Sequence, residues 1–313
     1  MSVTPVYAAY VPTYANREPY LTVEEYLAAP TGTDISQILP GGSPAQNRDA
    51  LKGVIQRASS EADVFAQQVL AATLDTQVAP PQGWRIIRRS GRTTLEIPVD
   101  YTPVVCVTGI SLGTDPSNVA ALTDLTGVWP SRKIVSVPVS GGAITTPPAG
   151  AVAGAGPTWP SAASGRYWGA VTYVNGFFNA TLSLPVSAGD TTVTPSDTLG
   201  LFPGLSFQVF DSLFATSETC QVAAGYIPGA ATVPLAAPLT YGHAAGTSVS
   251  ALPPAIRQAV ISLTSALIKR RGGEAIMLQS IHDEPSRVEQ GEPGMSSDEQ
   301  HAYALLRPFR RAA

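Results

Sequence analysis

Apolar residues recur at helical spacing over a long stretch near the start of the chain. Between residues 44 and 74 they return every three or four positions and form a continuous stripe. Ser43 suits the capping position, Pro44 suits the first helical position, and Gln46 completes a capping box. The pattern predicts a helix of about 30 residues that packs closely against another element.

Two further helices are predicted from the same kind of signal. Thr22 and Glu25 form a capping box in front of a short helix that Pro30 ends. A second long apolar stripe covers residues 254–271, and the glycine pair at 272–273 is expected to end that helix. Helical segments therefore flank the middle of the chain on both sides.

The region between the long helices changes to the two-residue period of β-strands. Short alternating runs are separated by Gly and Pro turns, and these turns are closely spaced after residue 179. The sequence predicts an α+β fold, with a helical core and a large inserted β-rich region that includes a short-strand barrel or sandwich. The expected division is an arm at 1–20, a helical part at 21–79, a β-rich and loop region at 80–178, a small β module at 179–251, a helix returning to the helical core at 252–273, and a tail at 274–313.

The two ends of the chain have distinct compositions. Tyrosines and prolines alternate in residues 1–20, which favours an extended arm. Tyr7, Tyr10 and Tyr14 are candidate interface residues, because tyrosine provides contact area at a low entropic cost; the alternative is a loosely ordered terminus. Residues 274–313 are expected to be a flexible tail with one short helix, signalled by Ser297 and Gln300.

Charged residues make up only 13% of the chain, and the formal net charge is −4. A surface with few charges is easily desolvated and suits contacts between subunits, although a GC-rich genome would favour the same composition. The negative balance argues against general binding of nucleic acid, which needs a basic surface. No run of about 18 apolar residues occurs, so no membrane span is expected.

No pattern of catalytic or ligand-binding residues rises above chance. The three histidines lie in separate polar or turn segments, and the sequence has no phosphate-binding loop and no nucleophile elbow. Cys106 and Cys220 lie in apolar stretches and are interpreted as buried thiols rather than a disulfide. We therefore expect no catalytic residue, no metal, no cofactor and no enzymatic activity.

Arginines gather in two places that could bind a partner. One is a predicted hairpin with Arg85, Arg88, Arg89 and Arg92, which is either an exposed hairpin or an interface with an acidic ring or DNA phosphates. The other is the end of the chain, where arginines surround one aromatic residue, and we interpret it as a mobile docking peptide. Its members are Arg307, Phe309, Arg310 and Arg311.

The order of these features resembles the head-tail adaptor, or connector, proteins of tailed bacteriophages. The resemblance rests on LTVEEYLAA, the long helix AQNRDALKGVIQRASSEADVFAQQVL, the strands LEIPVDYTPVVCVTGISL and VTYVNGF, and the helix LPPAIRQAVISLTSALIKRRG. These segments span most of residues 20–273. The phrases VSAGDTTVT and PLTYGHAAGTSVSALP are similar to a β module in such proteins from phages of actinobacteria.

This resemblance implies a structural virion protein at the head-tail junction, assembled in the host cytoplasm. Copies would form a ring, usually dodecameric, beneath the portal protein, and the ring would receive the tail or a stopper protein below. DNA would pass through the ring without sequence-specific binding, and no membrane would be involved. The alternatives are another virion part, such as a tail-completion, neck or decoration protein, and a glycan-binding module that uses Trp129, Trp159 and Trp168.

Overall fold

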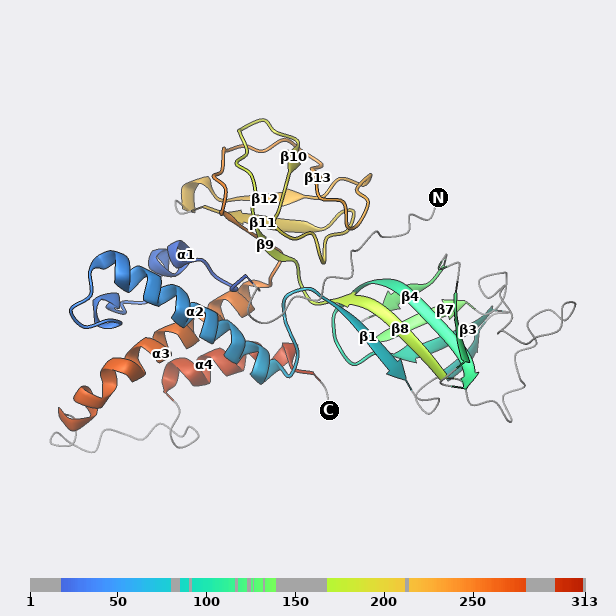
Figure 1. Ribbon diagram of the computed structural model, residues 1–313, viewed down its shortest axis with the longest axis horizontal. Helices are drawn as coiled ribbons and strands as arrows, with labels where there is room; N and C mark the ends of the chain where they lie inside the picture. The colour runs from blue at the N-terminus through green and yellow to red at the C-terminus, as the bar shows by residue number, and fades with distance from the viewer. Residues whose placement is uncertain are drawn as a thin grey trace, which may run out of the picture.

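The computed structural model describes residues 18–79, 85–89, 92–115, 118–122, 125, 127–131, 133–138, 168–211, 214–279 and 296–311. The chain has an α+β fold in which the sheets are antiparallel. Figure 1 shows a group of helices, a small β unit beside it, and a pair of larger sheets on the opposite side. Within this described part, no helix is both long and apolar enough to cross a membrane.

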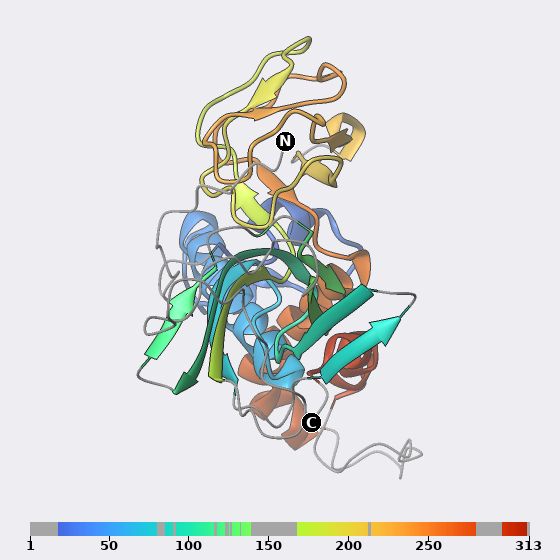
Figure 2. The same cartoon turned by 90° about the vertical axis from the view of Figure 1, so that its right-hand side faces the viewer.

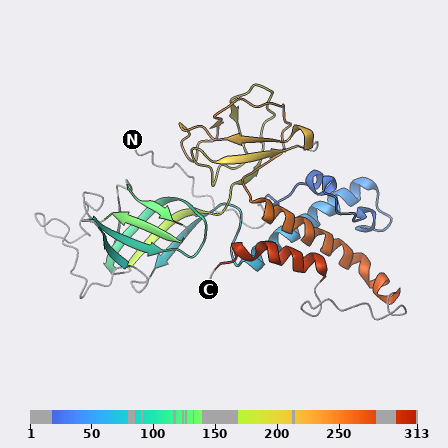
Figure 3. The same cartoon turned by 180° about the vertical axis from the view of Figure 1, so that it is seen from behind.

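The helical unit combines segments from both ends of the described chain. It contains α1 (Val23–Ala28), η2 (Ile35–Gln37), α2 (Pro44–Ala66), α3 (Pro254–Gln279), α4 (Ser297–Leu306) and η5 (Arg307–Phe309). One apolar cluster joins them, including Tyr26, Leu51, Ile256, Leu263 and Leu306, all nearly inaccessible to solvent. Figure 3 shows α4 running alongside α3. Helices far apart in sequence therefore share one core.

The predicted capping boxes of α1 and α2 are confirmed. Thr22 pairs with Glu25, and Ser43 pairs with Gln46, each with both reciprocal hydrogen bonds. In contrast, α2 was predicted to continue to residue 74, and it ends at Ala66 because Gln67 takes a left-handed conformation with φ of 56°. The chain then enters strand β1 (Thr73–Ala79), so the expected helical part, 21–79, includes a strand at its end.

Tyr20 explains why α2 ends where it does. The phenol donates a hydrogen bond to Asp63 and accepts hydrogen bonds from the backbone N–H groups of Leu70 and Ala71, at 3.1 and 3.0 Å. These bonds satisfy backbone donors that leave the helical register after Gln67. Tyr20 is fully buried, so the expected arm, residues 1–20, does not reach as far as residue 20.

The C-terminal helices also depart from the prediction. α3 continues through the glycine pair to Gln279, and α4 is capped by Ser296 and Glu299, one residue earlier than expected. Lys269 pairs with Asp298 at 2.6 Å, which helps to hold α4 against α3. Because α4 and η5 pack on the helical core, the end of the expected flexible tail is ordered structure, while residues 280–295 lie outside the described residues.

Two four-stranded sheets pack on each other through a shared apolar core. The first has the order β1-β8-β4-β5, and the second has the order β2-β3-β7-β6. Buried residues of both sheets meet in this core, including Leu95, Ile97, Ile110, Val137 and Tyr173. The strands are β1 (Thr73–Ala79), β2 (Arg85–Arg89), β3 (Arg92–Pro98), β4 (Val104–Asp115), β5 (Asn118–Ala121), β6 (Trp129–Ser131), β7 (Ile134–Pro138) and β8 (Trp168–Asn175).

The small β unit follows β8 and has a separate core that includes Phe178, Phe207, Val209 and Val249. Its strands are β9 (Asn179–Thr181), β10 (Thr192–Val193), β11 (Ser206–Phe210), β12 (Glu218–Gln221), β13 (Val233–Pro234) and β14 (Ser248–Ser250), with η4 (Phe214–Thr216) after β11. They form one sheet of order β12-β11-β14-β9 and the pair β10-β13. Figure 2 shows this unit at one end of the molecule.

Candidate interaction surfaces

The candidate interface tyrosines of the expected arm, Tyr7, Tyr10 and Tyr14, lie outside the described residues. The segment that follows them binds the small β unit. The side-chain amide of Asn179 donates to the carbonyl of Pro19 at 3.2 Å, and the Thr181 hydroxyl donates to the Glu18 carboxylate at 3.3 Å. The chain therefore enters the helical unit along β9.

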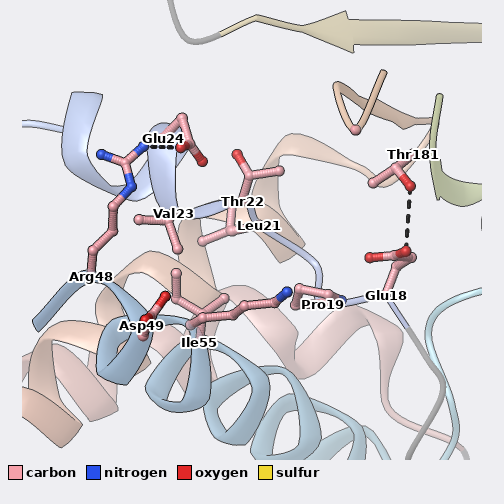
Figure 4. Close-up of a pocket in the computed structure, with 12 residues that line it drawn as sticks. Glu18, Pro19, Leu21, Thr22, Val23, Glu24, Arg48, Asp49, Ile55 and Thr181 are labelled. Atoms are coloured by element: carbon pink, nitrogen blue, oxygen red, sulfur yellow. Dashed lines mark hydrogen bonds and ion pairs between the residues drawn. The ribbon is translucent and has the colours of Figure 1, made fainter. Parts of the chain in front are cut away.

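A groove lies beside this entry, between the small β unit and helices α1 and α2. Figure 4 shows Glu18 and Thr181 on one side of it and the ion pair between Glu24 and Arg48 on the other. Its volume is about 390 Å³. Its lining mixes acidic and basic side chains around a few apolar ones, unlike the mostly apolar lining that is typical of pockets for small molecules.

The arginine hairpin forms as strands β2 and β3. Its register places Arg89 opposite Arg92, Arg88 opposite Thr93, and Arg85 opposite Glu96. The backbone thus brings two of the four predicted arginines to the turn end of the hairpin.

The arginine and phenylalanine residues at the end of the chain do not extend away from the protein. Arg311 pairs with Asp100 at 2.9 Å, and the ring of Phe309 packs edge-on against Phe177 with centroids 6.1 Å apart. Arg307 and Arg310 are exposed. The segment was predicted to be a mobile docking peptide, and the structure places it between the helical unit and the first sheet.

An ion pair that the sequence did not reveal joins the helices to the small β unit. The guanidinium of Arg257 in α3 pairs with Glu25 of α1 and lies 3.6 Å from the ring centre of Phe210 in β11. Both charged side chains are almost fully buried. Burial lowers the pKa of Arg257 to about 9, so the guanidinium remains charged at neutral pH. The sequence does contain one signal of this ion pair, because Arg257 interrupts the apolar stripe of the helix predicted at 254–271.

His243 forms a second buried polar cluster, inside the small β unit. Its Nε2 lies 2.9 Å from a Glu218 oxygen, and its Nδ1 lies 3.3 Å from an Asp211 oxygen. Glu218 also accepts hydrogen bonds from the N–H groups of Thr240 and Tyr241. The cluster therefore attaches the 240–243 turn to β12. Among the described residues, no group of three or more His, Cys, Asp or Glu side chains is arranged to bind a metal ion.

The Glu218 carboxylate should make the stability of the small β unit depend on acid pH. Burial alone would raise its pKa, but hydrogen bonds from Thr240, His243 and Tyr241 together lower the pKa below the usual 4.5. A lowered pKa adds stability that is present above the unfolded-state pKa and is lost as the pH falls through the folded-state pKa. Glu218→Gln should therefore lower the free energy of unfolding at pH 7. The difference in the free energy of unfolding between the variant and the wild type should shrink below pH 4.5. Urea unfolding across this range measures both; a difference that stays constant with pH would contradict the prediction.

Cys106 and Cys220 are not joined in a disulfide, as expected; Cys220 is buried, whereas Cys106 is only partly buried, which corrects the expectation that both are buried. Burial, with a smaller contribution from the nearby Glu218 charge, raises the pKa of Cys220 to about 12. Its thiol is therefore protonated at neutral pH and is a poor nucleophile.

No family model matches the sequence, and no curated protein matches it.

The tryptophans considered as a sugar platform are not gathered on one sheet. Trp129 is in β6 of the second sheet and is about half exposed, whereas Trp168 is in β8 of the first sheet. Trp159 lies outside the described residues. The main features of the described residues are thus one groove, the arginine hairpin and the buried contacts that join the units.

Proposed function

We propose that the protein is a non-enzymatic structural component of a tailed-phage virion, a head-tail adaptor that forms a ring beneath the portal. The observation that supports this best is the order and grouping of its elements. The segments on which the resemblance rests fold as α1, α2, β3, β4, β8 and α3, and α1 and α2 share a core with α3. The β strands lie between them in sequence, which is the layout that the resemblance implies.

The finer architecture belongs to the same proposal. Residues 20–71 and 252–311 would be the helical core of the adaptor, and the β-rich region between them would be an insertion. The strands around Phe207 and Val249 would form the small barrel or sandwich of that insertion. Their antiparallel pairing supports this assignment.

In this proposal the ring, with about twelve copies as in the resembling family, connects the portal to a stopper or tail-completion protein. The arginine hairpin is a candidate contact with an acidic surface of a neighbouring ring, because arginine makes fixed, multidentate contacts with carboxylates. DNA would pass through the lumen without sequence-specific binding, as the resemblance implies.

Imaging of purified protein and of virus particles tests the proposal. Negative-stain electron microscopy of the full chain mixed with portal protein should show closed rings stacked on the portal. Gold-labelled antibody should mark one vertex of each particle, where the tail joins. A decoration protein would instead be labelled over the whole shell. A chain that stays monomeric at micromolar concentration and is absent from particles would refute the virion role.

A further inference from the structure

One glutamine side chain links the end of the chain to the sheet side of the protein. The Nε2 of Gln68 donates to the carbonyl of Phe309 at 2.8 Å, and its Oε1 accepts from the N–H of Thr102 at 3.0 Å. Gln68 is buried, with 7% of its surface exposed. A buried amide group that loses a hydrogen-bond partner costs free energy. Loss of either bond therefore destabilises the buried position of the Gln68 side chain, and with it the other bond.

Arg311 makes a second link across the same junction. Its N–H donates to the carbonyl of Ala66, the last residue of α2, at 2.8 Å. Its guanidinium pairs with Asp100 at 2.9 Å and lies 4.9 Å from the ring centre of Tyr101. The backbone of Arg311 is thus bound to the helices, while its side chain is bound to the connection between β3 and β4.

We propose that residues 307–311 are an intramolecular latch that holds the first sheet against the helical unit. The surface beneath them is then a docking site for a short segment with arginine and phenylalanine, filled here by the chain's own C-terminal residues. A partner that binds residues 307–311 must first open the latch, which releases Asp100 and Tyr101 from Arg311 and leaves Thr102 bonded to Gln68. This inference does not depend on the proposed function, because every contact lies within one chain.

Amide hydrogen exchange, measured residue by residue by NMR on full-length variants, tests whether the contacts act as one unit. Arg311→Ala removes only the side-chain contacts to Asp100 and Tyr101, so its effect is measured at the Thr102 amide, which is bonded to Gln68. Gln68→Ala is measured at the Arg311 amide, which is bonded to Ala66. Arg57→Ala is the matched control, because this exposed guanidinium lies outside the latch and donates to the Gly53 carbonyl within α2.

If residues 307–311 act as a latch, removing one contact should speed amide exchange at the other contact. Arg311→Ala should speed exchange at Thr102 by about three- to tenfold, as expected for loss of one partly exposed ion pair and one cation–π contact. Gln68→Ala should speed exchange at Arg311 at least as much, and Arg57→Ala should change either amide by no more than about twofold. If each substitution affects only the amide that it contacts directly, the latch is refuted.

A synthetic peptide of residues 307–313, added to the Arg311→Ala protein, tests the docking site. At about millimolar concentration, comparable to the effective concentration of a tethered segment, it should restore at least half of the lost protection at Thr102. The same peptide carrying Arg311→Ala should restore none. Equal results with the two peptides would refute the docking site.

Discussion

Glu25→Gln is expected to lower the free energy of unfolding by about 3–5 kcal/mol, because it leaves the buried guanidinium of Arg257 without its counter-charge. Glutamine can still accept the hydrogen bond that Glu25 takes from the Thr22 N–H, so the substitution isolates the charge from the capping box. The stacked ring of Phe210 cannot replace a full negative charge. Chemical unfolding followed by far-ultraviolet circular dichroism measures the loss.

The adjacent residue provides a matched control. Glu24 pairs with Arg48, and both side chains are more than a third exposed. Glu24→Gln should therefore cost about 0–1 kcal/mol. Adding Arg257→Met to Glu25→Gln should recover part of the lost stability, because an apolar side chain removes the uncompensated charge. Equal losses from Glu24→Gln and Glu25→Gln would contradict this account of the buried pair.

Gly176→Ala is expected to cost about 4 kcal/mol or more, at the upper end of single substitutions. Gly176 has φ of +86°, and a Cβ there would lie 2.4 Å from the carbonyl oxygen of Ala71 and 2.9 Å from that of Leu70. Neither backbone group can move easily, because Phe177 donates to Leu70 and accepts from Ala72 in adjacent hydrogen bonds. Thermal unfolding and the yield of folded protein would both report the change.

Gly189→Ala separates conformational strain from steric overlap. Gly189 has φ of +93°, but a Cβ there would meet nothing within 4 Å. Its substitution should cost only about 1–2 kcal/mol, the penalty for a side chain in this backbone conformation. If the two alanine variants were equally stable, the close approach at Gly176 would not matter to folding.

The features that the sequence predicted well are local. Thr22 with Glu25 and Ser43 with Gln46 cap their helices as expected, because each capping box involves residues only three positions apart. The α+β class followed from the change of period along the chain. The closely spaced Gly and Pro turns likewise indicated short strands after residue 179, and one of these forms at Ser206–Phe210.

The errors arose where distant residues decide the outcome. The apolar spacing of α2 continues through Val69 and Leu70, but Tyr20 and Asp63 bind the backbone there and end the helix. The basic terminus looked mobile because its partners, Gln68 and Asp100, lie more than 200 positions away. No single-sequence pattern encodes such pairings.

The helical unit can be completed only late in synthesis. Its apolar cluster joins Leu51 and Val54 of α2 to Ile256 and Leu263 of α3, while the strands between them form their own cores. During translation the apolar faces of α1 and α2 therefore stay uncovered until about 190 further residues have left the ribosome. The nascent chain has its greatest need of chaperone protection in this interval, after α2 emerges and before α3 does.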